Sequence, residues 1–593
     1  MANIMSMKSV RNNPTRSGYD LSQKINFTAK AGSLLPVWWQ PLVPFDDINV
    51  HVSSFVRTQP LNTAAFARMR GYFDFYFVPY RQMWNKFPTA ITQMKTNLLH
   101  ASGPVLKDNS PLSDELPYFT AEQVAHYVES LEGSQNQFGF YRAWLVCIIL
   151  EYLGYGDFYS YISQSADGPG MTWETNPMLA NLKFSPFPLF AYQKIYADHN
   201  RYTQWERSNP STFNIDYVSG APETLQMNLS VEGFKDSFNL FDMRYCNWQR
   251  DLLHGTIPQA QYGEASAVPL SDNSFNITDG VIQFTQGQAF NETVVTNAEG
   301  KLSYGSTSNP QSGVFKLTGT PSEYGSISVL ALRRAEAAQK WREVALSAEE
   351  DYPSQIQSHW GQSVSQAYSD MCTWLGSVII DLSINEVVNN NITGENAADI
   401  AGKGTMSGNG GAHINVKGEY GILMCVFHVL PQLDYITSAP HFGTLLTNVL
   451  DFPLPEFDKI GMEQVPIIRG MNPVKGDSGF PVSDKLYFGY APQYYDWKTC
   501  LDKSMGAFKR SLKTWIIPFD DEQLVAADSV DFPNNPNVEE DSVKAGFFKV
   551  SPSVLNNLFG VNADSDVDTD QFLCSTSFKV NVVRSLDPNG LPY

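Results

Sequence analysis

Residues 46–84 carry the clearest pattern in the chain and read DDINVHVSSFVRTQPLNTAAFARMRGYFDFYFVPYRQMW. In the first half, Ile48, Val50 and Val52 alternate with polar residues, which is the period of a strand with one buried face. In the second half the odd-numbered residues Met69, Phe73, Phe75 and Phe77 are apolar, and we expect this odd face of the strand to enter a core. The even-numbered residues carry polar or amphipathic side chains, and we expect this even face to meet solvent or another chain. β-branched and aromatic residues at this density favour strands. The stretch therefore predicts a hairpin, that is, two paired strands joined by a short loop, in a β protein.

The composition limits the functions that the chain can have. Its 593 residues are 43% hydrophobic and 13% aromatic, and no charged or Ser/Gly-rich linker divides them. One large domain with long insertions is therefore as compatible with this length as two or three domains, and we take one domain, residues 1–593, as the prediction. The formal net charge of −20 argues against a surface that binds nucleic acid throughout, because a polyanion requires clustered Lys and Arg. Any such contact must be local.

The cysteines and apolar runs predict a protein that is made in a reducing compartment and is not inserted in a membrane. No apolar segment of the secretory type follows Met1. The longest apolar run, 143–150, is far shorter than the roughly 20 residues that a membrane span requires. The six cysteines form no CxxC pair and several lie in apolar runs, as is typical of reduced, buried thiols; they are Cys147, Cys246, Cys372, Cys425, Cys500 and Cys574.

Residues 1–45 are basic in an otherwise acidic chain. They show little periodicity, and their five cations stand against Asp20 alone; the cations are Lys8, Arg11, Arg16, Lys24 and Lys30. One interpretation is a solvated, poorly ordered terminus. The other is an extended basic N-terminal arm that contacts a phosphate backbone. On the second interpretation these five residues are the predicted nucleic-acid contacts.

Helical and strand patterns follow, separated by a long polar segment. Helices are predicted at about 119–133, 140–153, 188–206 and 328–347. In the last of these helices, four residues have the spacing of one packing face: Ala337, Trp341, Val344 and Ala345. His199 lies on one face of the third helix, where we expect a structural role rather than metal binding. Strands are predicted at 378–384, 422–430 and 572–583.

Residues 256–326 differ from the segments around them. They are rich in Ser, Thr, Asn and Gly, and little in them could bury a separate core. We therefore predict an insertion that projects from the surface. Strands near both ends of the chain, with helices and long loops between them, indicate a β-sandwich with decorated loops.

Several motifs resemble functional sites but lack essential parts. Residues 476–481, GDSGFP, are similar to the serine box of chymotrypsin-like proteases, but no histidine box accompanies them and Phe480 replaces a glycine. The glycine-rich run 402–411 lacks the Gly-Lys-Ser/Thr of a P-loop. An acidic run has the spacing of the start of a calcium loop without its glycine and closing glutamate, so a weak cation site and a solvated loop both remain open; it comprises Asp564, Asp566, Asp568 and Asp570. We predict no catalytic, cofactor or metal site.

Five blocks together resemble the major capsid proteins of the microviruses, the small tailless single-stranded DNA bacteriophages, and are closest to the gokushovirus-like members. The first two blocks are SGYDLSQKINFTAKAGSLLPVWWQPLVPFDDINV (17–50) and RMRGYFDFYFVPYRQMW (68–84). The third is MRYCNWQRDLLHGTIPQAQYG (243–263). The last two are LRRAEAAQKWREVA with DYPSQIQSHWG (332–361) and GYAPQYYDWKTCLDKSMGAFKRSLKTW (489–515).

This resemblance implies an eight-stranded viral jelly roll with large insertions and a non-enzymatic function. It implies self-assembly into a T=1 icosahedral shell around a circular single-stranded DNA genome, with assembly in the host cytoplasm and a final location in the virion. The implied partners are other copies of the chain, the genome, scaffolding and pilot proteins, and a host receptor. Beyond the end of the third block, residues 256–326 match no part of the family, and from their polar, turn-rich composition between two matching blocks we predict that they serve host attachment or shell decoration. Two alternatives remain: a cell-surface glycan-binding β protein and a serine hydrolase that uses the GDSG loop.

Overall fold

The computed structural model describes residues 15–92, 116–132, 137–158, 182–206, 208–218, 240–261, 263, 266, 283–284, 294–296, 302–304, 315–316, 329–365, 369–388, 400–416, 418–436, 439–470, 487–519, 545–560 and 569–588. Two compact units make up the chain. Residues 1–260, 350–353 and 364–593 form unit 1, and residues 261–349 and 354–363 form unit 2. The GDSGFP motif and residues 564–568 of the acidic run lie outside the described residues.

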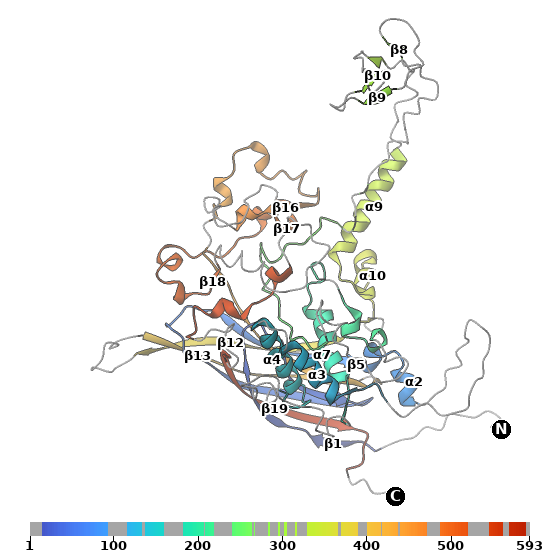
Figure 1. The fold of residues 1–593 in the computed structure, drawn as a ribbon, viewed down its shortest axis with the longest axis vertical. Helices are drawn as coiled ribbons and strands as arrows, with labels where there is room; N and C mark the ends of the chain where they lie inside the picture. The colour runs from blue at the N-terminus through green and yellow to red at the C-terminus, as the bar shows by residue number, and fades with distance from the viewer. Residues whose placement is uncertain are drawn as a thin grey trace, which may run out of the picture. The chain divides into compact units, whose positions relative to one another are not determined.

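Unit 1 is built on one curled antiparallel sheet of nine strands (Figure 1). The strand order is β1–β19–β4–β13–β12–β5–β14–β3, and β2 also pairs with β19. This architecture confirms the predicted fold class, a mainly β, jelly-roll-like sandwich with helices and long loops. The strands are β1 (Ser17–Asp20), β2 (Gln23–Ala29), β3 (Leu35–Leu42), β4 (Asp47–Thr58), β5 (Met69–Pro79), β12 (Thr373–Val388), β13 (Ile400–Asn415), β14 (Gly421–Pro431) and β19 (Phe572–Arg584).

The long strands β12 and β13 let the sheet fold over on itself. They pair with each other only between residues 382–388 and 400–406, and beyond that point β12 pairs with β5 while β13 pairs with β4. The two halves of the sheet therefore face each other and share one core. Trp38 of β3 stacks on Phe578 of β19 at 5.6 Å between ring centroids, and Phe27 of β2 meets Phe427 of β14 at 5.2 Å.

Strand β4 has the predicted face pattern, but the predicted pairing with β5 is wrong. Every second residue of β4, from Ile48 to Thr58, is buried. Strands β13 and β12 lie between β4 and β5 in the sheet order. The alternation of side chains specifies which face is buried and carries no information about which strand pairs with which.

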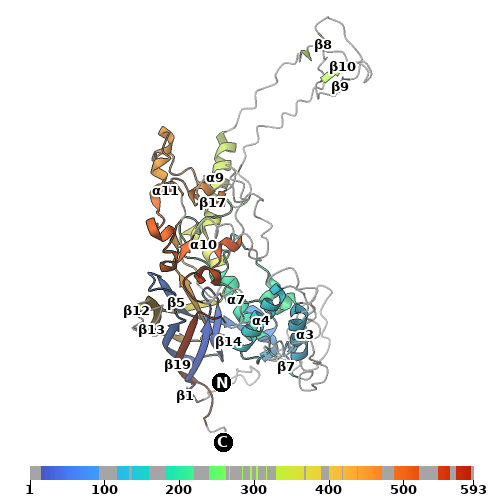
Figure 2. The same ribbon diagram turned by 60° about the vertical axis from the view of Figure 1, so that its left-hand side comes forward.

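The even face of β5 meets solvent at its start, where Arg70 is exposed as predicted, but it is buried further along the strand, contrary to the prediction. Asp74 and Tyr76 are buried, with 7% and 4% of their surface exposed. Helix α7 (Phe187–Ile195) and the π-helix that continues it, Tyr196–Asn200, cover this face, and the ring centroids of Tyr76 and His199 are 5.1 Å apart. Figure 2 shows α7 grouped with α3 (Ala121–Glu132) and α4 (Gln137–Tyr152) beside β14.

The other predicted elements of unit 1 are confirmed with shifted ends. The predicted helix 188–206 ends as a helix at Asn200, and the predicted strands 378–384, 422–430 and 572–583 lie in β12, β14 and β19. Five of the six cysteines are buried and none forms a disulfide; Cys500 is exposed. The remaining short elements of unit 1 are α1 (Tyr80–Met83), α2 (Phe87–Thr92), α11 (Tyr495–Lys498), β6 (Phe119–Thr120), β7 (Lys183–Phe184), β15 (Asp434–Tyr435), β16 (Met462–Pro466), β17 (Tyr487–Pro492) and β18 (Pro518–Phe519).

The N-terminal segment contributes to the sheet instead of forming an arm along its whole length. Strands β1, β2 and β3 occupy most of residues 17–42. Apolar residues at every second position of β2, Ile25, Phe27 and Ala29, point to the core side and are partly or fully buried. The prediction of an extended arm over 1–45 is therefore wrong for residues 17–42. The alternating run in β2 holds only three apolar residues, which is too few to stand out in the sequence.

Unit 2 contains helix α9 (Val329–Ser347), most of α10 (Tyr352–Trp360) and two short strand pairs. These pairs are β8 (Gln283–Phe284) with β11 (Phe315–Lys316) and β9 (Val294–Thr296) with β10 (Leu302–Tyr304). Helix α9 is confirmed, but the predicted packing face is wrong: no residue of α9 is buried, and Trp341 is 58% exposed.

The insertion begins later than residue 256. The Thr256 carbonyl accepts hydrogen bonds from the hydroxyl of Tyr202 (3.0 Å) and the indole N–H of Trp205 (2.8 Å), and Thr256 is buried in unit 1. Ile257 exchanges two backbone hydrogen bonds with Tyr490, of 3.0 and 2.7 Å. Residues 256–260 therefore belong to the jelly-roll unit.

Candidate nucleic-acid interface

One face of the sheet is exposed and polar, and we call it the polar sheet face. It consists of the outward side chains of β2, β19, β4 and β13, whose inward neighbours fill the core. In β4 and β19 the exposed and buried side chains alternate strictly over most of the strand. Small polar side chains dominate it, and its main members are Lys24, Asn26, Thr28, Asn49, His51, Ser53, Phe55, Arg57, Ser407, Asn409, His413, Leu573, Ser575, Ser577, Lys579 and Asn581.

The register of the strands brings cations from distant parts of the sequence onto this face. Lys24 of β2 lies opposite Ser577 of β19, which lies opposite Ser53 of β4. Lys579 is two residues further along β19, opposite His51. Because neighbouring strands lie about 4.8 Å apart, these groups share one small area. Arg57, further along β4, adds a third permanent positive charge.

Carboxylates are few on the polar sheet face. Asp20 and Asp47 lie at the end near β1, and Asp570 accepts a hydrogen bond from the Thr28 hydroxyl at the other end. These three carboxylates stand against four cations, Lys24, Arg57, Lys579 and the exposed Lys403 of β13, in a chain whose net charge is −20. Asp47 Oδ1 lies 2.7 Å from Nε2 of His413. Hydrogen bonds from Ser22 lower the pKa of the exposed Asp20 carboxyl. The face is locally basic, as contact with a phosphate backbone requires.

Phe55 is an exposed aromatic side chain in the middle of this polar surface. It is 42% exposed, and its register partners are Ser407 on β13 and Ser575 on β19. The guanidinium carbon of Arg57 lies 5.1 Å from the centroid of its ring. Exposed aromatic rings beside basic groups are used by proteins that bind single strands through stacking.

Three of the five predicted nucleic-acid contacts lie among the described residues, and each has a different environment. Lys8 and Arg11 lie outside the described residues. Arg16 is exposed beside the polar sheet face and donates to the carbonyls of Phe45 (2.6 Å) and Val583 (3.3 Å). Lys24 is on the face itself.

Lys30 is buried and is not available to a nucleic acid. Only 4% of its surface is exposed, and its ammonium lies 4.7 Å from the centroid of the Trp144 ring. It lines a cavity of about 520 Å³ between β2, β3 and α4, together with the carboxylates of Glu151, Asp157 and Asp570. Burial and the charge of Asp157 raise the pKa of Glu151. Three carboxylates around one cation repel phosphate.

Arg57 and Lys579 are cations of the face that sequence reasoning missed. Both lie at outward positions of strands that were predicted, so their exposure could have been read from the alternation. Their proximity to Lys24 could not, because it depends on pairings between residues more than 500 positions apart.

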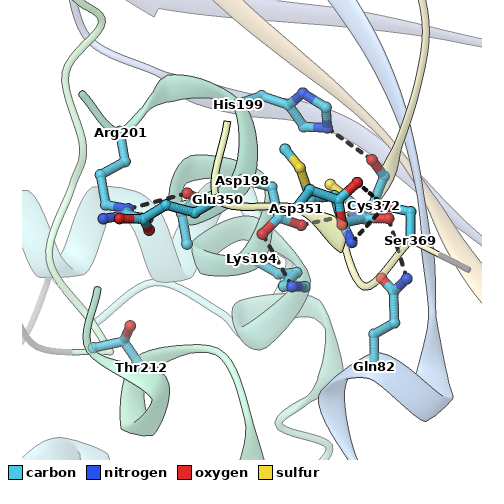
Figure 3. Close-up of polar contacts among 12 residues, drawn as sticks. Gln82, Lys194, Asp198, His199, Arg201, Thr212, Glu350, Asp351, Ser369 and Cys372 are labelled. Atoms are coloured by element: carbon cyan, nitrogen blue, oxygen red, sulfur yellow. Dashed lines mark hydrogen bonds and ion pairs between the residues drawn. The ribbon is translucent and has the colours of Figure 1, made fainter. Parts of the chain in front are cut away.

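A buried polar cluster, formed by α7 and the following π-helix with residues 350–351 and 369–372, has the composition of a catalytic site (Figure 3). Lys194 Nζ lies 3.0 Å from Asp198 Oδ1, and Asp198 Oδ2 accepts the backbone N–H of Cys372 at 2.7 Å. His199 Nε2 lies 2.7 Å from the carbonyl oxygen of Cys372, which agrees with the structural role expected for this histidine.

The chemistry of this cluster is structural. Burial raises the pKa of the Cys372 thiol well above its usual range, so the thiol stays protonated at neutral pH and is a poor nucleophile. Asp198 accepts the backbone N–H of Cys372 and His199 lies against its carbonyl, while the charge of Asp198 and a hydrogen bond to it raise the pKa of the thiol further. Nearby, Arg201 donates to Glu350 at 3.0 Å and Ser369 donates to Asp351 at 3.0 Å. Together these contacts hold residues 350–351 and 369–372 against α7 and the π-helix that continues it.

A second buried cluster is formed by Asp251, His254 and Tyr435. The His254 backbone N–H donates to Asp251 Oδ1 at 2.8 Å, and the Tyr435 hydroxyl lies 2.9 Å from His254 Nδ1. The His254 ring stacks on Phe547 at 4.5 Å. Burial and the charge of Asp251 raise the pKa of Tyr435 well above its usual range. The hydrogen bonds are made within the cluster, which indicates a structural role here too.

The described residues contain neither a metal-binding cluster nor a membrane-spanning helix. Within the described ranges, no group of three or more His, Cys, Asp or Glu side chains is placed to hold a metal ion. Asp570, the described member of the acidic run, accepts a hydrogen bond from the Thr28 hydroxyl. No helix among those described is both long and apolar enough to cross a bilayer.

Comparison with known families finds a match for the region that contains the first two sequence blocks. Residues 8–101 match the model of a family described as Capsid protein (F protein). This stretch contains β1 to β5, including two strands of the polar sheet face. The comparison with curated proteins finds no match. The resemblance to the microvirus major capsid proteins is thus confirmed over residues 8–101.

Proposed function

Because residues 8–101 match the capsid protein (F protein) family and unit 1 is a jelly roll, we propose that this chain is a microvirus major capsid protein that forms a T=1 icosahedral shell around a circular single-stranded DNA genome. The family match carries the proposal. In this function the chain is a structural, non-enzymatic subunit of the virion, assembled in the host cytoplasm with scaffolding and pilot proteins.

Electron microscopy of the purified full-length protein tests shell formation. A capsid subunit forms closed particles of uniform diameter, with sixty copies in a T=1 shell. Particle images and the particle mass together give the copy number. A protein that stays monomeric under all assembly conditions would contradict the proposal.

We further propose that the polar sheet face contacts the genome, with Lys24, Arg57 and Lys579 on phosphates and Arg16 beside them. These groups concentrate positive charge in an acidic chain, and Lys30 is excluded by burial. Contact by Lys8 and Arg11 stays a prediction from sequence.

Changing Lys24, Arg57 and Lys579 together to Gln is expected to weaken DNA binding and flatten its salt dependence. Each phosphate contact on single-stranded DNA contributes about 0.7 to the slope of log affinity against log salt, so three lost contacts reduce the slope by about 2. Titration of a fluorescent oligonucleotide at several salt concentrations measures this. The matched control changes three exposed cations elsewhere in unit 1, Lys459, Lys503 and Arg510, and an equal loss there would refute the assignment to the face.

We also propose that the insertion in unit 2 contributes to host attachment. Removing residues 267–326 is expected to leave particle assembly intact and to reduce adsorption to host cells, since residues 256–260 stay in unit 1 and α9 is kept. Ser266 is bound to Gln339 of α9 at 3.3 Å, ten residues from the start of that helix at residue 329. A Gly/Ser linker of about eight residues spans the roughly 15 Å between them. Loss of folding in this variant would show that the segment is part of a core.

A further inference from the structure

The side chains around Phe55 leave its ring accessible to a flat aromatic ligand and offer little apolar area to another protein. Its register partners, Ser407 and Ser575, are small, and Asn26 of β2 lies opposite Ser575 in the same row. Small side chains on both sides leave the ring standing above its neighbours. Their hydroxyl and amide groups can donate and accept hydrogen bonds at the edge of anything that stacks there.

Leu573 extends the apolar area by one residue. It lies opposite Arg57 and, like Phe55, is 42% exposed. Thr28 and Thr405 complete this row on either side. The result is a small apolar platform, Phe55 with Leu573, which has the Arg57 guanidinium against it and hydroxyl groups around it.

We propose that Phe55, Leu573 and Arg57 form a stacking platform for unpaired bases, so that the polar sheet face prefers single-stranded over double-stranded nucleic acid. This inference rests on the proposed contact between the face and the genome. It adds that the face holds bases as well as phosphates.

Two physical arguments favour this occupant. In a duplex the base faces are stacked on one another, so a ring on a sheet surface can stack only on bases that are unpaired. A stable protein partner would need about 800 Å² of surface on each side with an apolar centre. The platform offers two apolar side chains in a polar, basic field, which is complementary to a polyanion with flat apolar bases.

The test compares three probes on the full-length protein: a 20-nucleotide oligo-dT, a 20-base-pair duplex, and an abasic strand of the same length. The abasic strand keeps the phosphates and removes the bases. Base stacking contributes roughly 1–3 kcal/mol, which corresponds to about 5- to 150-fold in affinity. Phe55→Ala is therefore expected to weaken binding of the oligo-dT by that factor without changing the salt slope, and to leave duplex and abasic binding unchanged.

Two further variants make the readout specific. Phe55→Trp keeps a flat ring and is expected to restore oligo-dT binding. Phe66→Ala removes an aromatic side chain that is 66% exposed but packs near Phe508 and Trp515, away from the face, and is expected to bind like the unmodified protein.

The outcomes separate this inference from the proposed function. If the protein binds oligo-dT and abasic strands equally, or if Phe55→Ala binds normally, base stacking is refuted while phosphate contact and the capsid function stand. If the Lys24, Arg57 and Lys579 variant also binds normally, the face is not the nucleic-acid surface. Capture of a second protein at Phe55 in place of DNA would likewise overturn the platform.

Discussion

Replacing Phe75 with Asp is expected to abolish folding of the jelly roll. Phe75 is fully buried in β5, where it lies opposite Gly376 of β12 and Cys425 of β14. A carboxylate there loses its hydration, which costs several kcal/mol unless a partner is supplied. Because whole domains are stable by only about 5–15 kcal/mol, one such change consumes much of the stability. The variant should accumulate as aggregate without closed particles.

Expression, circular dichroism and particle imaging measure this outcome. The matched control is Ile379→Asp, which places the same carboxylate on neighbouring strand β12 at a position that is 52% exposed. The control is expected to fold, since its carboxylate stays hydrated. Normal particles from Phe75→Asp would show that β5 does not line the core as described.

The second large effect is expected at Gly408, in the glycine-rich run 402–411. A Cβ atom at this position would overlap Cγ2 of Ile380, which reaches across from β12. The same holds two residues on, where a Cβ at Gly410 would lie 2.9 Å from Val378 Cγ2. Gly408→Ala is therefore expected to lower the free energy of unfolding by about 1–3 kcal/mol through overpacking.

A double-mutant cycle shows whether the cause is this contact. Ile380→Ala alone removes buried methyl groups and is expected to cost about 2–5 kcal/mol. In the double variant the new Cβ fills part of the space left by Ile380, so the combined loss should be smaller than the sum by about 0.5–3 kcal/mol. Urea denaturation measures each stability.

Gly18→Ala is the control for the glycine substitution itself. A Cβ at Gly18 would have no atom within 4 Å, so stability should change little. Strictly additive losses at residues 380 and 408 would contradict close packing between the two halves of the sheet.

The glycine run shows which properties follow from a local motif and which do not. Its spacing excluded a P-loop, and the run lies in strand β13. The need for glycine arises from the tertiary structure, because Gly408 and Gly410 leave room for side chains of β12. Nothing within residues 402–411 identifies those neighbours.

Elements with a strong local period are recognisable without the tertiary structure. The alternation in β4, β12 and β19 depends only on the two-residue repeat of a strand, so faces and approximate ends follow from nearby residues. Helix α9 was likewise recognisable from its helix-forming residues, while its lack of buried side chains was not.

Strand pairing and the grouping of the cations depend on contacts between distant parts of the chain. Lys24 and Lys30 lie six residues apart in one basic segment, yet Lys24 is exposed on the polar sheet face and Lys30 is buried against Trp144 of α4. Arg57 and Lys579 join Lys24 only through the register of β19 with β2 and β4. Local sequence specifies the side of a strand on which a residue lies, whereas long-range packing specifies what covers that side, because burial depends on elements that are distant in the chain.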